Sequence, residues 1–257
     1  MMAKSARKRE AANRLITAKS GASGETGTPL ANIDIIQSCR LAFRSGRQKG
    51  TWGGARNRAD RVSQNLTRRQ CEGILAAAAR LEKQSMTFNR HWTVHYERAG
   101  IRDSDGAAFI GKLLKRAGEH VRRTGGTMAA IWIRENGEGK GAHVHILLHL
   151  SGTATLQNLT RRWIKAAGGT YRKGVSEVRS IGGTLASAKA NTERHNANVG
   201  NVLAYLMKGA SDHTGRELGL NRYGAGGSII GKRCGWTQNI GQASRQFLLG
   251  NNGRADG

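Results

Sequence analysis

The chain has 257 residues, which is enough for one sizeable hydrophobic core with appendages. Its 42 Lys and Arg against 17 Asp and Glu give a formal charge of +25. This charge argues against basic partners and favours a polyanion, with nucleic acid as the first interpretation and an anionic membrane surface as the rival. No apolar run approaches the roughly 20 residues that span a bilayer, and no signal-peptide pattern is present, so we expect a cytoplasmic protein with no membrane partner.

The amino-terminal part differs in composition from the rest. Residues 1–65 are polar, basic and rich in Gly and Ser, and such a segment cannot bury enough apolar surface to order itself. We therefore expect a flexible basic arm over 1–65. Residues 66–85 form a helical lead-in, because Leu66, Ile74, Leu75, Ala78 and Leu81 can share one helix face.

From residue 86 the pattern indicates a folded domain that extends to residue 241, followed by a disordered tail over 242–257. Alternation predicts strands at 92–96, 128–134, 142–150 and 176–181, with a last strand at 228–232. Helical spacing predicts helices at 104–123, 155–167 and 199–208, whereas 182–198 is polar and aperiodic and is either functional or disordered. The predicted fold class is α+β, with a central antiparallel sheet and helices packed mainly on one face.

The strand over 142–150 carries the sharpest local feature, a His-Val-His sequence. Successive side chains of a strand alternate between faces, so Val144 and Ile146 face away from His143 and His145. Two imidazoles on one strand face are suited to a divalent metal. His149 lies on the same face and is interpreted as a bystander or as a residue that contacts one of the metal-binding side chains.

The preceding strand supplies a carboxylate for the same site. Glu135 lies eight residues before His143 across a Gly-rich turn, and this even offset places it on the face of His143 and His145. A His, His, carboxylate set with open positions is how catalytic metal sites are built. The alternative is that the two histidines only line a solvated sheet face, and Glu135 favours the metal. His91 and His95 are expected to be exposed or to face DNA.

A tyrosine and a lysine lie on the predicted helix over 199–208. Its apolar stripe contains Val199, Leu203 and Leu206, and it presents Tyr205 and Lys208 on the polar side. These two residues are three apart and are therefore neighbours. A phenol is a poor nucleophile at neutral pH unless a cation or metal favours the phenolate. By itself, Tyr205 is more typical of an ordinary tyrosine that packs on the flank of a helix. Its occurrence together with the histidine strand favours the interpretation of Tyr205 as a nucleophile.

The histidine strand, the earlier Glu135 and the later Tyr205-Leu206-Met207-Lys208 together resemble the HUH endonucleases, specifically single-tyrosine initiators of rolling-circle replication. The resemblance covers roughly residues 86–241. The strand over 92–96 is similar to that family's first motif, and 232–241 resembles a segment of bacterial members. The tyrosine follows the histidine motif, as in replication initiators and some transposases.

The resemblance implies that Glu135, His143 and His145 bind Mg²⁺ or Mn²⁺, that Tyr205 is the nucleophile and that Lys208 assists it. It implies nicking and rejoining of single-stranded DNA at a replication origin, with host helicase and polymerase as further partners. We expect DNA phosphates to be contacted by basic residues outside the catalytic set, namely Arg161, Arg162, Lys165, Lys232 and Arg233. The alternatives are a transposase with the same chemistry and a non-catalytic nucleic-acid-binding module.

Overall fold

The computed structural model describes residues 59–151, 156, 158–182, 190–224 and 226–241. Within these ranges, five antiparallel strands form a sheet in the order β5-β2-β4-β3-β7. The strands are β2 (Arg90–Val94), β3 (Met128–Gly137), β4 (Gly141–Leu150), β5 (Ser176–Ser180) and β7 (Cys234–Trp236). A separate pair joins β1 (Val62–Ser63) to β6 (Ile229–Ile230). The α+β class with an antiparallel sheet is thus confirmed.

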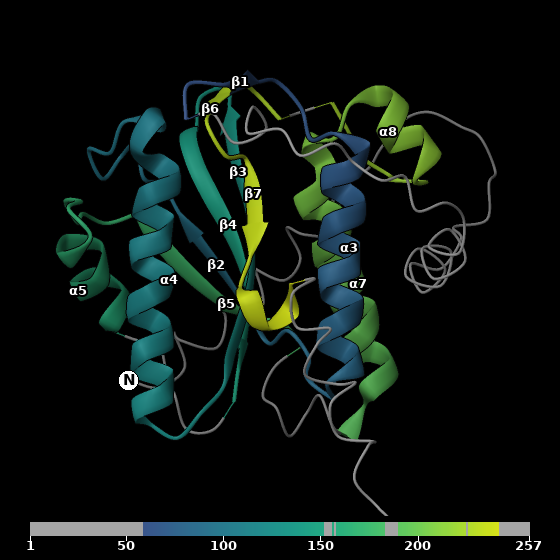
Figure 1. The fold of residues 1–257 in the computed structure, drawn as a ribbon, viewed down its shortest axis with the longest axis horizontal. Helices are drawn as coiled ribbons and strands as arrows, with labels where there is room; N and C mark the ends of the chain where they lie inside the picture. Colours follow the sequence, from purple (N-terminus) through teal and green to yellow (C-terminus); the bar gives the residue numbers. More distant parts are fainter. Residues whose placement is uncertain (1–58, 152–155, 157, 183–189, 225, 242–257) are drawn as a thin grey trace, which may run out of the picture. The chain divides into compact units, whose positions relative to one another are not determined.

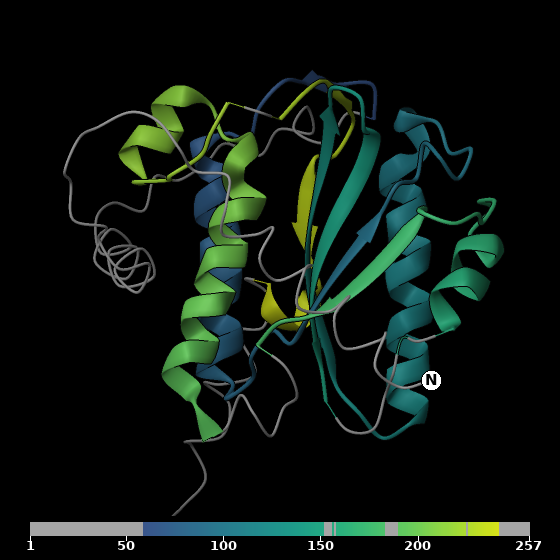
Figure 2. The same ribbon diagram turned by 180° about the vertical axis from the view of Figure 1, so that it is seen from behind.

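Helices cover both faces of the sheet, as Figures 1 and 2 show. One face carries α4 (Gly106–Arg123) and α5 (Leu159–Ala166), and the other carries α3 (Arg68–Lys83) and α7 (Thr192–Leu206). The prediction of helices mainly on one face is therefore wrong. The histidine-bearing face also presents apolar side chains, among them Ile131, Ile133 and Leu147, which must be covered to leave water.

Two hydrophobic clusters hold the layers together. The cluster between the sheet and α4 and α5 contains Trp92, Val144 and Ile146. The cluster between the sheet and α3 and α7 contains Leu147 and Leu203. The short elements beside them are η2 (Asp103–Asp105), η3 (Met207–Gly209), α8 (Asp212–Glu217) and η4 (Gln238–Ile240).

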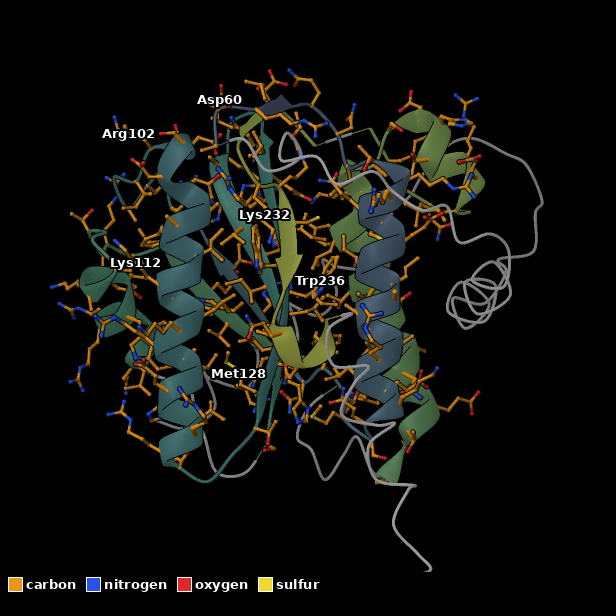
Figure 3. The ribbon with its side chains drawn as sticks, in the orientation of Figure 1. Asp60, Arg102, Lys112, Met128, Lys232 and Trp236 are labelled. Atoms are coloured by element: carbon orange, nitrogen blue, oxygen red, sulfur yellow. The ribbon has the colours of Figure 1, made fainter. Side chains whose placement is uncertain are left out.

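Helix α3 is part of the folded unit and not a lead-in to it. It begins with a capping box in which the Thr67 side chain accepts from the Gln70 backbone while the Gln70 side chain accepts from the Thr67 backbone. A Cβ at Gly73 would lie 2.6 Å from the ring of Trp236, which Figure 3 places between β7 and α3, so this helix approaches the sheet closely. The expected domain start at residue 86 is therefore too late.

The expected boundary of the arm at residue 65 also differs from the structure. Val62 and Ser63 form β1, so the folded unit begins before residue 65. Residues 1–58 and 242–257, which contain most of the expected arm and the expected tail, lie outside the described residues.

The β3–β4 hairpin positions the metal-ligand candidates. Its turn needs Gly139 and Gly141, whose φ values of 71° and 68° lie in the left-handed region that costs glycine little. With this turn, Glu135 pairs directly with His143 across the ladder. The predicted register is confirmed, and it puts Glu135, His143 and His145 on one face.

The predicted elements toward the carboxyl end differ most from the structure in their bounds or partners. Helix α7 starts at Thr192 with Asn191 as its N-cap, so residues 192–198 of the segment predicted to be aperiodic are helical. Its first turns are polar because they lie at the surface, which hides the helical period. Of the predicted last strand over 228–232, only β6 forms, and it pairs with β1 outside the five-stranded sheet. The edge strand next to β3 is β7, which was not predicted.

Candidate metal centre and tyrosine site

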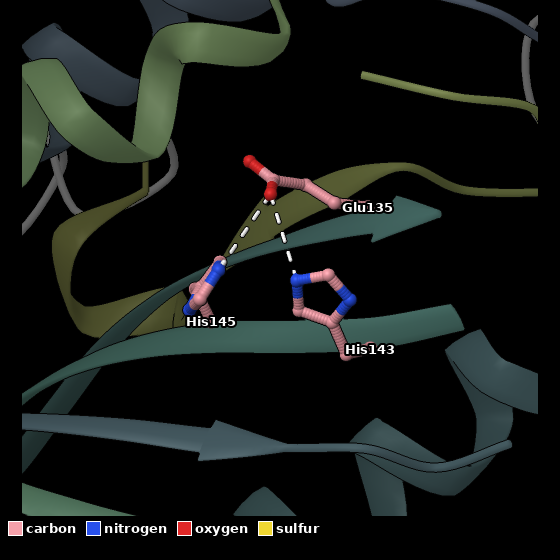
Figure 4. Close-up of side chains that lie close together, drawn as sticks. All are labelled: Glu135, His143 and His145. Carbon is pink, nitrogen blue, oxygen red and sulfur yellow. Dashed lines mark ion pairs between the residues drawn. The ribbon is translucent and has the colours of Figure 1, made fainter. Parts of the chain in front are cut away.

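Three side chains converge on one point above the sheet. Glu135 Oε2 lies 3.6 Å from Nε2 of both His143 and His145, and Figure 4 shows the carboxylate directed at the two rings. Their ligand atoms all lie within 4.8 Å of one another. The exposed fractions are 2% for Glu135, 4% for His143 and 5% for His145, so the alternative in which the histidines line a solvated sheet face is wrong. Helices α3 and α7 enclose this face.

Hydrogen bonds to the other ring nitrogens direct the imidazoles toward the carboxylate. His143 Nδ1 donates to the Gly141 carbonyl at 2.8 Å, which leaves the Nε2 lone pair directed at Glu135. His145 Nδ1 contacts both Thr93 Oγ1 and His91 Nε2 at 3.1 Å. A partner on the remote nitrogen is the usual way that a protein fixes the tautomer of a metal-binding histidine.

Electrostatics keep the donors in the form that a metal needs. Burial alone would raise the pKa of Glu135, but contacts with His143 and His145 and the charge of Lys208 hold it well below its ordinary value. Burial lowers the pKa of His145 against the opposing effect of Glu135. At neutral pH the centre therefore offers a carboxylate together with a neutral imidazole at His145.

The donor set fits a divalent ion. Glu135 Oε1 and His145 Nε2 are buried and have no hydrogen-bond partner among the residues that the structure describes. Unpaired buried polar atoms are costly, and a cation held by these atoms would remove that cost. Two imidazoles and one carboxylate leave coordination positions open, as in a catalytic centre. A group that could hold a metal is thus present, and the donors alone do not select the ion.

Tyr205 and Lys208 lie at the mouth of this centre. The Tyr205 ring meets the His145 ring edge-on with centroids 5.6 Å apart, and 37% of Tyr205 is exposed. Lys208 lies in η3, just beyond the end of α7, and not within the helix as predicted. Its ammonium bonds Glu135 and lies 4.2 Å from the Tyr205 ring centroid. The tyrosine, the lysine and the candidate metal ligands thus form one contiguous site.

Two further histidines pack against the ligands. His91 hydrogen-bonds His145, and the His95 ring stacks on His143 with centroids 5.0 Å apart. Both are partly buried, so the expectation that they are exposed is wrong, whereas the alternative that they face DNA stays a prediction. His149 donates to the Thr87 carbonyl at 2.7 Å and does not reach the ligand set. His91 and Thr93 are positioning residues that the sequence analysis did not identify. Strand alternation was a usable signal, because it places both residues on the opposite face from buried Trp92.

The predicted DNA-binding residues do not surround the site. Arg161, Arg162 and Lys165 are exposed on α5, which covers the opposite face of the sheet. Lys232 lies on that same side, where its ammonium is 5.4 Å from the Trp132 ring centroid (Figure 3).

Arg233 has a structural role and is only 1% exposed. Its guanidinium donates to Ser63 and to the carbonyls of Gly226 and Gly227, which ties β1 to the loop before β6. These bonds leave it no path to a phosphate, so its assignment as a DNA contact is corrected. Predicting phosphate contacts from charge fails at Arg233 because charge does not report burial.

Comparisons with known proteins add no family to this geometry. No protein-family model, curated protein or solved structure matches the chain. Among the helices of the described residues, none is long and apolar enough to cross a membrane.

The His91 environment predicts a pH dependence of stability. Burial, followed by the neighbouring His145, Arg179 and Lys208, lowers the pKa of His91 to about 4. A depressed pKa means that the unfolded chain binds the proton first, so this contribution is complete above about pH 6.5 and is lost as the pH falls toward 4. At about 1.36 kcal/mol per pKa unit, the loss is at most about 3 kcal/mol.

The measurement is the melting temperature of the metal-free protein at pH 7 and near pH 4.5, compared with that of His91→Gln. Glutamine cannot titrate and still offers an amide to His145, so the variant should show a smaller drop between the two pH values. An equal drop in both proteins would contradict the assignment of His91 as a buried neutral group.

Proposed function

We propose that this chain is a metal-dependent endonuclease that nicks and rejoins single-stranded DNA through a tyrosine, and that it initiates rolling-circle replication of a plasmid or phage. One observation carries the proposal. An exposed tyrosine, Tyr205, contacts one of two buried histidines that converge with Glu135, and Lys208 bridges the two groups. The resemblance of these motifs to HUH replication initiators points to the same chemistry.

Glu135, His143 and His145 would hold Mg²⁺ or Mn²⁺, which when bound would polarise the scissile phosphate and stabilise the leaving 3′ oxygen. The Tyr205 hydroxyl attacks the phosphorus, a phosphotyrosine bond to the 5′ phosphate forms, and the bond to the 3′ oxygen breaks. The phenol proton leaves to solvent, and the 3′ oxygen takes up a proton. Because one phosphodiester replaces another, the same site can rejoin the ends.

The surrounding residues prepare this step without changing covalently. Helix α7 buries Leu203 and Leu206, and this packing fixes Tyr205 above the sheet. Thr93 and His91 hold His145 in place. Lys208 supplies positive charge beside both the phenol ring and the carboxylate, where an incoming phosphate would be attracted.

The test is incubation with single-stranded oligonucleotides and Mn²⁺, followed by a denaturing gel. We expect a protein–DNA adduct that survives denaturation and a free 3′-OH fragment. DNA binding without any adduct would favour the non-catalytic module. A transposase would give the same adduct, and the preferred substrate, a replication origin or an element end, would separate the two.

The amino-terminal segment should contribute affinity and not chemistry. Residues 1–58 carry 12 Lys and Arg against 3 Asp and Glu but none of the site residues. Deleting them should weaken DNA binding and reduce the slope of log affinity against log salt by about 0.7 for each phosphate that the segment neutralises in the full chain. Binding of both proteins at several salt concentrations measures this.

Nicking under saturating substrate is the control for that deletion and should be unchanged. A slope equal to that of the full chain would show that the segment does not contact DNA. A lower nicking rate at saturation would show that it supports the catalytic site.

A further inference from the structure

A pocket of about 560 Å³ adjoins the tyrosine site. It is lined by Lys140, Tyr205, Lys208, Asn221, Arg222 and Tyr223. Lys140 comes from the β3–β4 turn, whereas residues 221–223 follow α8. The pocket therefore begins at the proposed nucleophile and continues onto residues that have no part in the metal centre.

The lining has the charge of a phosphate-binding surface. Three of its residues are cationic and none is acidic. Lys208 is engaged by Glu135, but the side chains of Lys140 and Arg222 are exposed and make no ion pair among the described residues. Two cations without counter-charges, beside a phenol proposed to attack a phosphate, suit the backbone of a nucleic acid strand.

Tyr223 adds a fixed aromatic surface. The inner edge of the Tyr223 ring packs on Gly215 of α8. The approach is so close that a Cβ at Gly215 would lie 2.2 Å from Tyr223 Cγ. The next residue, Gly224, donates its backbone N–H to the Ala210 carbonyl at 2.8 Å and anchors the segment. Tyr223 is nevertheless 38% exposed. A ring held on one side and open on the other is a stacking platform for a base.

We propose that this pocket is a nucleotide subsite of the DNA strand, in which a base next to the scissile phosphate stacks on Tyr223 while Lys140 and Arg222 bind flanking phosphates. The inference rests on the proposed function for the identity of the polymer and deepens it by assigning where the neighbouring nucleotide lies. Because every base has a stacking face, the subsite accepts any base and gives affinity and position, with little sequence selectivity.

The experiment separates base contacts from phosphate contacts. Binding is measured by fluorescence anisotropy with EDTA present, using an oligonucleotide of about 12 thymidines and an abasic strand of equal length and charge. The full-length protein should bind the thymidine strand more tightly. Tyr223→Ala should weaken thymidine binding by about tenfold and leave abasic binding unchanged, whereas Tyr223→Phe should match the parent protein on both strands.

The cations should behave differently from the ring. The Lys140→Ala, Arg222→Ala double variant should weaken both strands to a similar extent and reduce the salt slope by about 0.7 for each phosphate that the two side chains bind. Tyr171→Ala is the matched control, because Tyr171 packs with the core on the opposite face of the sheet and should not change the thymidine-to-abasic ratio. If Tyr223→Ala does not fold, Tyr223→Leu fills the same space without a stacking face.

An unchanged thymidine-to-abasic ratio in both Tyr223→Ala and Tyr223→Leu would overturn the subsite. Adduct formation with Mn²⁺, measured on the same proteins, distinguishes this outcome from failure of the proposed function. If the adduct forms and the thymidine-to-abasic ratio is unchanged, the proposed endonuclease activity stands and the subsite proposal is wrong. A changed ratio without any adduct keeps the pocket as a nucleotide site and removes the nicking activity.

Discussion

Replacing Tyr205 with phenylalanine should abolish both nicking and the covalent adduct while leaving affinity for single-stranded DNA nearly unchanged. The hydroxyl is the only group removed, and its oxygen is the atom proposed to form the new bond to phosphorus. The ring that contacts His145 and Lys208 remains, so the packing around the candidate metal ligands is kept. Loss of a catalytic nucleophile costs on the order of 10⁶ in rate, which places the variant below detection on a gel.

Tyr171→Phe is the matched control, since it removes a hydroxyl from the other side of the sheet and should retain full activity. If Tyr205→Phe still forms an adduct, the nucleophile is another tyrosine. Tyr223, which lines the same pocket, would be the next residue to replace.

Truncating either histidine of the candidate centre should remove the stabilisation that Mn²⁺ gives and abolish nicking. His143 and His145 each direct one nitrogen at Glu135, so His143→Ala or His145→Ala deletes a ligand. We expect metal affinity to fall by at least the roughly 10–100-fold that follows loss of an outer partner. The measurement is the shift in melting temperature on adding Mn²⁺, which does not depend on activity.

The metal-free variants should also be less stable, because both side chains are buried. Glu135→Gln should act in the same direction but less completely, since one neutral oxygen donor remains. His149→Ala is the control, because His149 bonds the Thr87 carbonyl and not the ligand set; its Mn²⁺-induced shift should equal that of the parent protein. A normal Mn²⁺-induced shift in both His143→Ala and His145→Ala would show that these histidines are structural core residues and not ligands.

Local pattern was sufficient for the hairpin that carries the ligands. The alternation over 142–150 and the even offset from Glu135 to His143 fix which side chains share a face, because the strand period is two and the glycine turn sets the register. The stripe of Val199, Leu203 and Leu206 fixed the orientation of Tyr205 by the same kind of argument for a helix.

The sequence could not predict which strands lie next to one another in the sheet. β2 lies beside β4, although β3 follows β2 in the chain, and this order places Thr93 opposite His145 and brings His91 into contact with it. Strand order depends on contacts distant in sequence, so neither positioning residue was identified. The same limit applies to Arg233, a buried residue whose hydrogen bonds to Ser63 join segments 170 residues apart.

The sequence by itself determined that the chain is strongly basic, that its sheet is antiparallel and that Glu135, His143 and His145 share one face, because charge and alternation are local properties. Only the tertiary structure decided that α3 and α7 bury this face, that Lys208 joins Glu135 to Tyr205, and that residues 221–223 complete a pocket beside them. The physical reason is that burial and ion pairing depend on which surfaces pack together. Which surfaces pack together depends on the whole apolar surface of the chain and not on any short segment.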